Sequence, residues 1–187
     1  RCIVLSFAPE SIAPPPRRLR VLMGFPRPIQ AGRILKDLSS LGLASIWFCL
    51  SSLGEKSYAE SRFFRDRDFQ SHLEEGAEQG GNPFVPEVKT FWSLERALEA
   101  LGEEERPEAW TKICCHPGKD RPRLGEARGL VEPCVLALGS ERGWTDDEVA
   151  CMEGRGFSIY QLGDRILKTE TAATAAAAMI LSDLGYM

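Results

Sequence analysis

The stretch LGDRILKTETAATAAAAMIL, from Leu162 to Leu181, joins a basic loop to an almost pure run of alanine. Alanine has the highest intrinsic helix propensity, and its small side chain lets a second backbone approach closely. The stretch therefore predicts a tightly packed helix at Glu170–Leu184. We expect Thr169 to cap this helix, and Glu170 lies where the helix dipole favours an anion. A plain core helix explains the alanine run equally well.

Elsewhere, short apolar runs alternate with segments of helical period, which is typical of an α/β domain with a largely parallel sheet. Strands are expected at Cys2–Phe7, Leu19–Phe25, Ser45–Leu50, Thr111–Cys115, Cys134–Leu138 and Phe157–Gln161. Further helices are expected at Ile29–Leu41, Ser61–Gln79, Leu94–Leu101 and Asp146–Arg155. The helix from Asp146 has the clearest local signal, because Thr145 and Glu148 form a capping box.

Composition indicates a soluble globular protein with one main domain. The chain has 187 residues, of which 43% are hydrophobic and 27% are charged. No apolar run approaches the roughly 20 residues that a membrane-spanning helix needs, and the first residues lack the layout of a signal peptide. We therefore expect a cytoplasmic protein without a membrane partner.

The six cysteines show no CxxC pair and favour buried, reduced thiols. Cys114, Cys115 and His116 are adjacent and suggest a metal site. Consecutive strand residues point to opposite faces, however, and cannot converge on one ion. We expect no metal.

The net charge of −4 argues against a polyanionic partner, but basic residues are crowded near the amino end of the chain. They leave room for a local basic face, in which Arg27, Arg33 and Lys36 are the candidate residues for binding a polyanion such as RNA. The alternative is a solvated surface with scattered arginines.

Two loops carry a family resemblance. The sequence LALGSERGWTDDEVACMEGRGFSIYQLGDRILKTETAATAAAAMIL resembles, nearly position for position, the C-terminal motifs of the RsmE family of ribosomal RNA (uridine-N3) methyltransferases in the SPOUT superfamily. The loop at Leu138–Trp144 matches the family's Gly-Pro-Glu-Gly-Gly-like loop, and Leu162–Ala172 matches its Leu-Gly-x-Arg-Ile-Leu-Arg-Thr-Glu-Thr-Ala segment. The resemblance runs from Leu19 to the C-terminus.

This chain departs from the family pattern in three places. Ser140 stands where the family usually has proline. Arg142 or Trp144 stands where the family usually has a second glycine. An arginine that usually follows the Glu-Gln pair is missing near Asn82.

The resemblance implies a SPOUT fold, an α/β domain with a mostly parallel sheet and a C-terminal deep trefoil knot, that works as a homodimer. It also implies a small PUA-like β-barrel ahead of the catalytic domain. The sequence APESIAPPPRR contains three consecutive prolines, which neither a strand ladder nor a helix accommodates. We therefore divide the chain into residues 1–16, a barrel remnant plus linker, and residues 17–187, the methyltransferase domain. Because a lone first strand has no reason to persist, we expect the rest of the barrel to be missing from this sequence; loss in this lineage is the alternative.

The resemblance further implies S-adenosylmethionine as the cofactor, bound by backbone groups of the knot loops. The residues that match such a cradle are Leu138, Gly139, Glu141, Gly143, Leu162, Gly163, Ile166, Leu167, Thr169, Thr171 and Ala172.

Methylation at uridine N3 requires removal of a proton and stabilisation of the resulting anion. Arg165 is the first candidate for that stabilisation, since a guanidinium offers paired N–H donors. Glu141 and Glu170 are candidate proton acceptors or cofactor-orienting groups. Structural roles are the alternatives, with Arg165 binding loop carbonyls and Glu170 serving the helix terminus.

Two functions stay open at this point. The first is an enzyme that methylates a uridine N3 in small-subunit (16S) ribosomal RNA, with that RNA or the assembled subunit as its partner. The alternative is a knotted protein that binds the cofactor or RNA without methylating it.

Overall fold

The computed structural model describes residues 2–6, 8, 15–104 and 106–187, and these form one sheet of six parallel strands. The strand order is β3-β2-β1-β5-β4-β6. The strands are β1 (Arg17–Gly24), β2 (Leu43–Cys49), β3 (Glu87–Phe91), β4 (Thr111–Cys115), β5 (Cys134–Leu138) and β6 (Ser158–Tyr160). The predicted parallel α/β sheet is confirmed.

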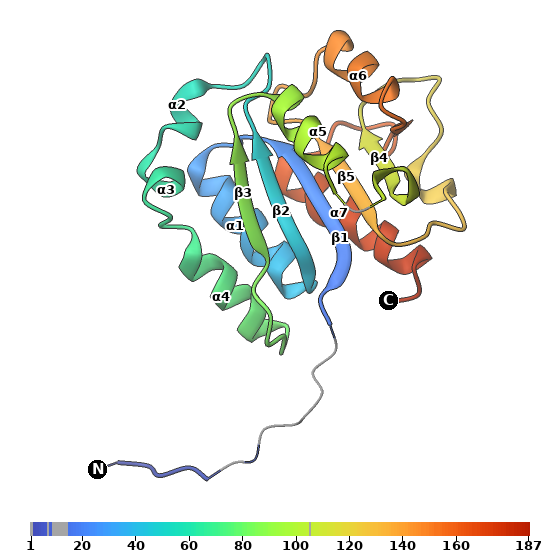
Figure 1. The fold of residues 1–187 in the computed structure, drawn as a ribbon. Helices are drawn as coiled ribbons and strands as arrows, with labels where there is room; N and C mark the ends of the chain where they lie inside the picture. The colour runs from blue at the N-terminus through green and yellow to red at the C-terminus, as the bar shows by residue number, and fades with distance from the viewer. Residues whose placement is uncertain (1, 7, 9–14, 105) are drawn as a thin grey trace.

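Helices cover both faces of the sheet, which gives three layers (Figure 1). The helices are α1 (Pro28–Ser40), α2 (Lys56–Ala59), α3 (Arg62–Arg65), α4 (Gln70–Gln79), α5 (Leu94–Gly102), α6 (Asp146–Glu153) and α7 (Thr169–Asp183), with 3-10 turns η1 (Pro107–Ala109) and η2 (Leu124–Glu126). The face under α1, α4 and α7 holds one apolar core, which includes Leu35, Phe48 and Leu136. The face under α5 and α6 holds a second core around Trp47 and Leu98.

The alanine-rich helix α7 is buried in the chain's own core. Ala173, Ala176 and Ala177 have no exposed surface, and Ile180 and Leu181 are equally buried beside α1 and β5. The small side chains thus permit close packing, as predicted. Thr169 is the first helical residue, whereas the capping position belongs to Lys168, which makes no side-chain cap. The predicted cap at Thr169 is therefore wrong.

Two expectations about other segments are also wrong, and one strand was not predicted. No strand forms in residues 2–6, and Phe7 lies outside the described residues. The helix expected at Ser61–Gln79 is interrupted between α3 and α4, where Arg67 has a left-handed backbone with φ of 59°. The edge strand β3 was missed because most of its side chains are exposed and polar, so it lacks the apolar run of a buried strand.

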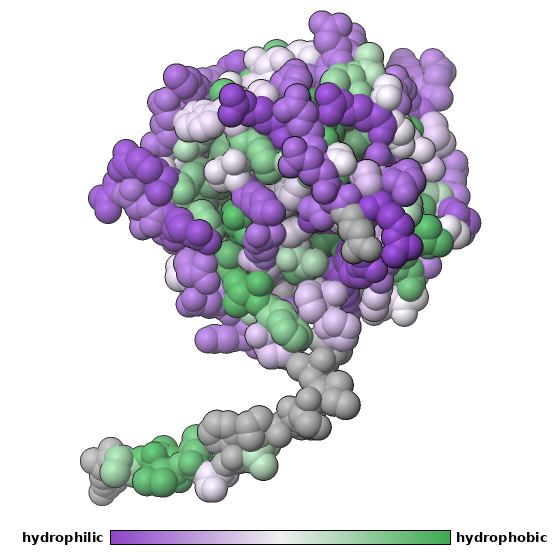
Figure 2. All heavy atoms as spheres, in the orientation of Figure 1, coloured by the Kyte–Doolittle hydropathy of each residue, from purple (hydrophilic) through white to green (hydrophobic). Residues whose placement is uncertain are grey.

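The surface is mostly hydrophilic over the face drawn in Figure 2. An apolar exception is the amino-terminal segment, in which Ile3, Val4 and Leu5 are at least 80% exposed. No helix within the described ranges is long and apolar enough to cross a membrane.

A glycine contact fixes the spacing of α1 and α4. A Cβ atom at Gly76 in α4 would lie 2.2 Å from the backbone oxygen of Lys36 in α1. The helices can pack at this distance only while position 76 has no side chain.

We expect Gly76→Ala to lower the free energy of unfolding by about 2 kcal/mol, because the new methyl group forces two packed helices apart. Gly102→Ala, in α5, is the matched control, since a Cβ atom there meets nothing within 4 Å. Because alanine has a higher helix propensity than glycine, Gly102→Ala should raise the free energy of unfolding by up to about 1 kcal/mol. Urea titrations measure both changes, and a stable Gly76→Ala protein would contradict the packing argument.

Candidate active site

The carboxyl ends of β4, β5 and β6 border a cavity of about 690 Å³. Its walls are residues 115–119 and Arg123 after β4, residues 138–143 around the end of β5, residues 161–167 after β6, and Thr169 and Ala172 of α7. Ligands of open parallel sheets bind at this edge, in a crevice outside the carboxyl ends of the strands. The volume lies in the range of cavities that hold drug-sized ligands, roughly 300–1,000 Å³.

Most of the residues predicted to bind a cofactor lie together around this cavity. They are Leu138, Gly139, Glu141, Gly143, Leu162, Gly163, Ile166, Leu167, Thr169 and Ala172, and the predicted catalytic Arg165 lies with them. Thr171 and Glu170 do not line the cavity. The binding and catalytic roles of all these residues stay predictions.

The loop after β5 makes a turn in which two glycines meet. A Cβ atom on Gly139 would lie 2.5 Å from the Cα atom of Gly143. Gly143 has a φ of 75°, and its N–H donates to the carbonyl of Ser140 at 2.9 Å. Both glycines are needed for this shape, one for the close approach and the other for the left-handed backbone.

The same loop is fastened to the other half of the sheet. The carboxylate of Glu141 accepts a hydrogen bond from the backbone N–H of Arg27 at 2.9 Å, and Arg142 pairs with Glu55 at 3.2 Å. Glu148 is 6% exposed and accepts a hydrogen bond from the Ser52 backbone N–H at 2.7 Å. The capping box between Glu148 and Thr145 is present as predicted. These contacts hold the cavity loop against the loops that follow β1 and β2.

The segment after β6 offers unpaired backbone groups to the cavity. From Leu162 to Leu167, no backbone N–H donates a hydrogen bond to another described group. Ile166 is 88% exposed and Leu167 is 38% exposed. Exposed apolar side chains beside free backbone donors form a surface that a flat, polar-edged ligand can cover.

Sequence reasoning missed the wall formed by the β4–β5 connection. Cys115, His116, Lys119 and Arg123 all line the cavity. Burial raises the pKa of the Cys115 thiol to about 12, so it is not a nucleophile at neutral pH. The missed signal was the position of His116 directly after a predicted parallel strand, where ligand-contacting residues gather.

The connection is bonded to the residue that follows β6. The backbone N–H of Gln161 donates to the Pro122 carbonyl at 2.9 Å, and its carbonyl accepts from the Leu124 N–H at 2.9 Å. Its side-chain amide donates to the carbonyl of Arg121 at 2.5 Å. Three residues of the connection, Arg121, Pro122 and Leu124, are thus bonded to Gln161.

The candidate RNA-binding residues lie outside the cavity, on or next to α1. Arg27 donates from Nε to the Tyr58 hydroxyl at 3.0 Å, and this bond raises the pKa of Arg27. Arg33 pairs loosely with Glu170 at 3.7 Å, while Lys36 pairs with Glu75 at 2.8 Å. All three are charged side chains with partners on neighbouring elements.

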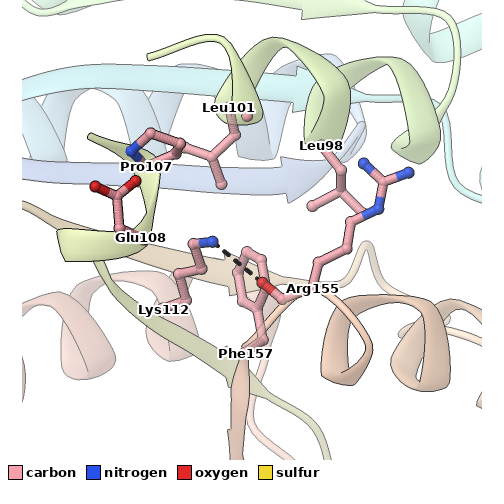
Figure 3. Close-up of a pocket in the computed structure, with 8 residues that line it drawn as sticks. Leu98, Leu101, Pro107, Glu108, Lys112, Arg155 and Phe157 are labelled. Atoms are coloured by element: carbon pink, nitrogen blue, oxygen red, sulfur yellow. Dashed lines mark hydrogen bonds between the residues drawn. The ribbon is translucent and has the colours of Figure 1, made fainter. Parts of the chain in front are cut away.

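A second cavity, of about 420 Å³, lies on the α5 side of the sheet (Figure 3). Leu98, Leu101 and Phe157 form its apolar wall, and the Lys112 ammonium donates to the carbonyl of Arg155 at 3.1 Å. None of the predicted site residues lines it. It lies toward the amino end of β4, away from the edge where parallel sheets bind ligands. No cluster of His, Cys, Asp or Glu that could hold a metal occurs in the part of the chain that the structure describes.

The chain is similar to known proteins over most of its length. Residues 13–181 match the model of a family described as an RNA methyltransferase domain. A relative from Treponema pallidum named ribosomal RNA small subunit methyltransferase E is 37% identical over 88% of this chain and 62% of its own length. A relative from Borreliella burgdorferi named ribosomal RNA small subunit methyltransferase E 1 is 33% identical over 90% of this chain and 68% of its own length.

Among solved structures, the Neisseria gonorrhoeae ribosomal RNA small subunit methyltransferase E bound to S-adenosyl methionine aligns with a TM-score of 0.75 at 26% identity. The alignment covers 89% of this chain and 66% of that one. The chain therefore spans slightly less than two thirds of the length of the T. pallidum and N. gonorrhoeae proteins.

We expect Glu148→Ala to lower the free energy of unfolding by about 2–3 kcal/mol, because it removes a helix cap and leaves the Ser52 N–H without its charged acceptor. Glu153→Ala, in the same helix, is the control, since the Glu153 side chain makes no hydrogen bond or ion pair with a described residue. It should change stability by less than about 0.5 kcal/mol. Equal losses in a denaturant titration would show that the Glu148 contacts do not stabilise the loop.

Proposed function

Because the chain belongs to the family of RNA methyltransferase domains, we propose that it transfers a methyl group from S-adenosylmethionine to N3 of a uridine in small-subunit ribosomal RNA. The names of its T. pallidum and B. burgdorferi relatives support this RNA class. The N. gonorrhoeae structure, bound to S-adenosyl methionine, supports the cofactor. The observation that carries the proposal is the 690 Å³ cavity between the loops after β4, β5 and β6.

The residues around the cavity fit this cofactor. The free N–H groups between Leu162 and Leu167 can bond the adenine edge, and Ile166 and Leu167 can cover its faces. The cations Lys119 and Arg123 line the same cavity and can pair with the carboxylate of the amino-acid part. When bound, the cofactor supplies a methyl group on a sulfonium, which is a good leaving group. The protein has to position donor and base and to make N3 electron-rich.

Arg165 is our candidate for stabilising the base as N3 loses its proton. It lines the cavity, it is exposed, and its guanidinium has no ion pair or hydrogen bond among the described residues. A planar guanidinium can donate two parallel N–H bonds to oxygens that gain negative charge. Its free donors are available for an incoming base.

The two carboxylates are less suited to accept the proton. Glu141 lines the cavity but already accepts the Arg27 N–H, and Glu170 faces Arg33 from outside the cavity. We therefore propose that Glu141 orients the loop and that Glu170 serves the start of α7, where a carboxylate suits the helix dipole.

We further propose that the chain is knotted. The bonds of Gln161 to residues 121–124 support this topology, as does the hydrogen bond from the Leu130 N–H to Asp183 in α7 at 2.7 Å. Both contacts join the β4–β5 connection to the part of the chain that runs from β6 to the end of α7.

A homodimer that binds RNA through Arg27, Arg33 and Lys36 is also a proposal. We expected the carboxyl end of α7 to contribute Met179, Ile180, Leu181 and Leu184 to the dimer surface, but Ile180 and Leu181 are buried in the chain's own core. The remaining support is Ile29, 67% exposed on α1, and Met179, 38% exposed on the neighbouring α7. We also propose that residues 1–16 are a barrel remnant plus linker and that the methyltransferase domain begins at residue 17.

The first test of the function is methylation of small ribosomal subunits that lack the modification. We expect Arg165→Ala to bind S-adenosylmethionine normally and to methylate about a hundredfold more slowly, the scale of a lost anion-stabilising donor. Arg165→Lys should recover part of the rate, since it keeps the charge without the planar fork. Arg155→Ala, which removes an exposed arginine of the second cavity, should act as wild type.

Two outcomes would contradict these assignments. Normal methylation by Arg165→Ala would exclude the catalytic role of this side chain. Wild-type protein that binds the cofactor and RNA without methylating would favour the alternative, a binding protein.

The cofactor cradle has a separate test. We expect Gly139→Ala to weaken S-adenosylmethionine binding at least tenfold, because the new methyl group would collide with the backbone of Gly143 and displace the turn. Gly125→Ala is the control, since a Cβ atom there meets nothing within 4 Å. Calorimetry gives both dissociation constants, and equal values would remove the β5 loop from the cofactor site.

A further inference from the structure

His116 is a cavity residue that the proposed mechanism leaves unused. It follows the carboxyl end of β4 directly, and its backbone N–H donates to the carbonyl of Tyr160 in β6 at 2.9 Å. The connection beyond it is fixed by Gln161. The imidazole is therefore attached to backbone that is held on both sides, and it lines the cavity beside Cys115 and Lys119.

The two ring nitrogens of His116 are in different environments. Nδ1 is buried and has no hydrogen-bond partner among the described residues. Nε2 also has no hydrogen-bond partner among the described residues. Unlike Nδ1, it is not buried, so part of its surface is exposed. Because the residue lines the cavity, Nε2 is the nitrogen that a ligand can reach.

This asymmetry determines the protonation state. A charged imidazolium carries protons on both nitrogens and would bury an unpaired, charged donor at Nδ1. Burial lowers the pKa of His116, and so does the nearby positive charge of Arg121. The negative charge of Asp146 raises this pKa, but its effect is smaller. Unpaired buried N–H groups are rarer than under-satisfied acceptors, so the neutral ring should carry its proton on Nε2.

We propose that His116 is a neutral hydrogen-bond donor, through Nε2–H, to a carbonyl oxygen of the target uracil. This inference rests on the proposed function. N3 of uracil lies between two carbonyl groups, and both oxygens take up negative charge when N3 loses its proton. Arg165 and His116 offer hydrogen-bond donors from two walls of one cavity. Each of the two uracil carbonyl oxygens can therefore accept a hydrogen bond from a different residue.

The proton of N3 passes to water, and the N3 electron pair forms the new N3–CH3 bond. The electron pair of the broken S–CH3 bond stays on sulfur. His116 neither gains nor loses a proton, because its free lone pair is on the buried Nδ1 and no proton can reach it from the base. A neutral Nε2–H can donate a hydrogen bond to the developing negative charge without transferring its proton.

The first test uses the free protein and nitrogen-15 NMR. The chain holds two histidines, so a His72→Gln variant assigns both imidazoles. We expect His116 to show the Nε2–H tautomer and to stay neutral to a lower pH than the ordinary value of 6.5. A proton on Nδ1, or an ordinary pKa, would overturn the inference whether or not the protein is an enzyme.

The second test uses full-length variants and small ribosomal subunits. His116→Ala should lower kcat about thirtyfold or more, as for other lost donors to developing charge, with cofactor Kd changed less than twofold. His116→Gln keeps an N–H donor and should recover part of the loss, and His72→Gln is the control with normal kcat. The pH profile of kcat should keep the same shape in wild type and His116→Gln.

Each failure has a distinct signature. An acid limb in the wild-type profile that disappears in His116→Gln would make His116 a general base and overturn the donor role. A tenfold loss of cofactor affinity in His116→Ala would assign Nε2 to the cofactor and overturn the contact with the base. A wild-type protein that methylates no subunit would refute the proposed function, and the contact with uracil with it.

Discussion

The hydrogen bonds of Gln161 are the constraint on which the cavity depends. This residue follows β6 and binds Arg121, Pro122 and Leu124, which belong to a connection between two other strands. Together with the pairing of β4 and β6 and the bond from His116 to Tyr160, these bonds hold the β4 wall and the β6 wall of the cavity against each other. The bonds are made largely by the backbone, so they depend on where the chain passes more than on which side chains it carries.

The sheet could be predicted from the sequence where strands are buried on both faces. Runs such as Cys134–Leu138 have no exposed side chain and read as continuous apolar segments. β3 gave no such signal because it lies at the edge and exposes polar residues. The break between α3 and α4 depends on a left-handed Arg67, a backbone state for which arginine has no local preference.

The site was predictable to the extent that a motif identified it. The glycine turn at Gly139 and the loop at Leu162–Leu167 came from resemblance, and they line one cavity. Thr171 was included because it lies within the motif, yet helix α7 turns it to the exposed surface. His116 was considered only as a metal ligand and rejected as one, because its other possible role depends on a cavity that three distant segments form together.

The unpaired backbone between Leu162 and Leu167 has a consequence for how a ligand associates. In many loops, a ligand must first compete with internal hydrogen bonds, and part of its binding enthalpy is lost in breaking them. Here the N–H groups donate no hydrogen bond to any other described group, so a ligand that binds them displaces no hydrogen bond within the described part of the chain. Association should therefore require no slow opening step in this segment, and its rate should be set by diffusion and by the docking orientation.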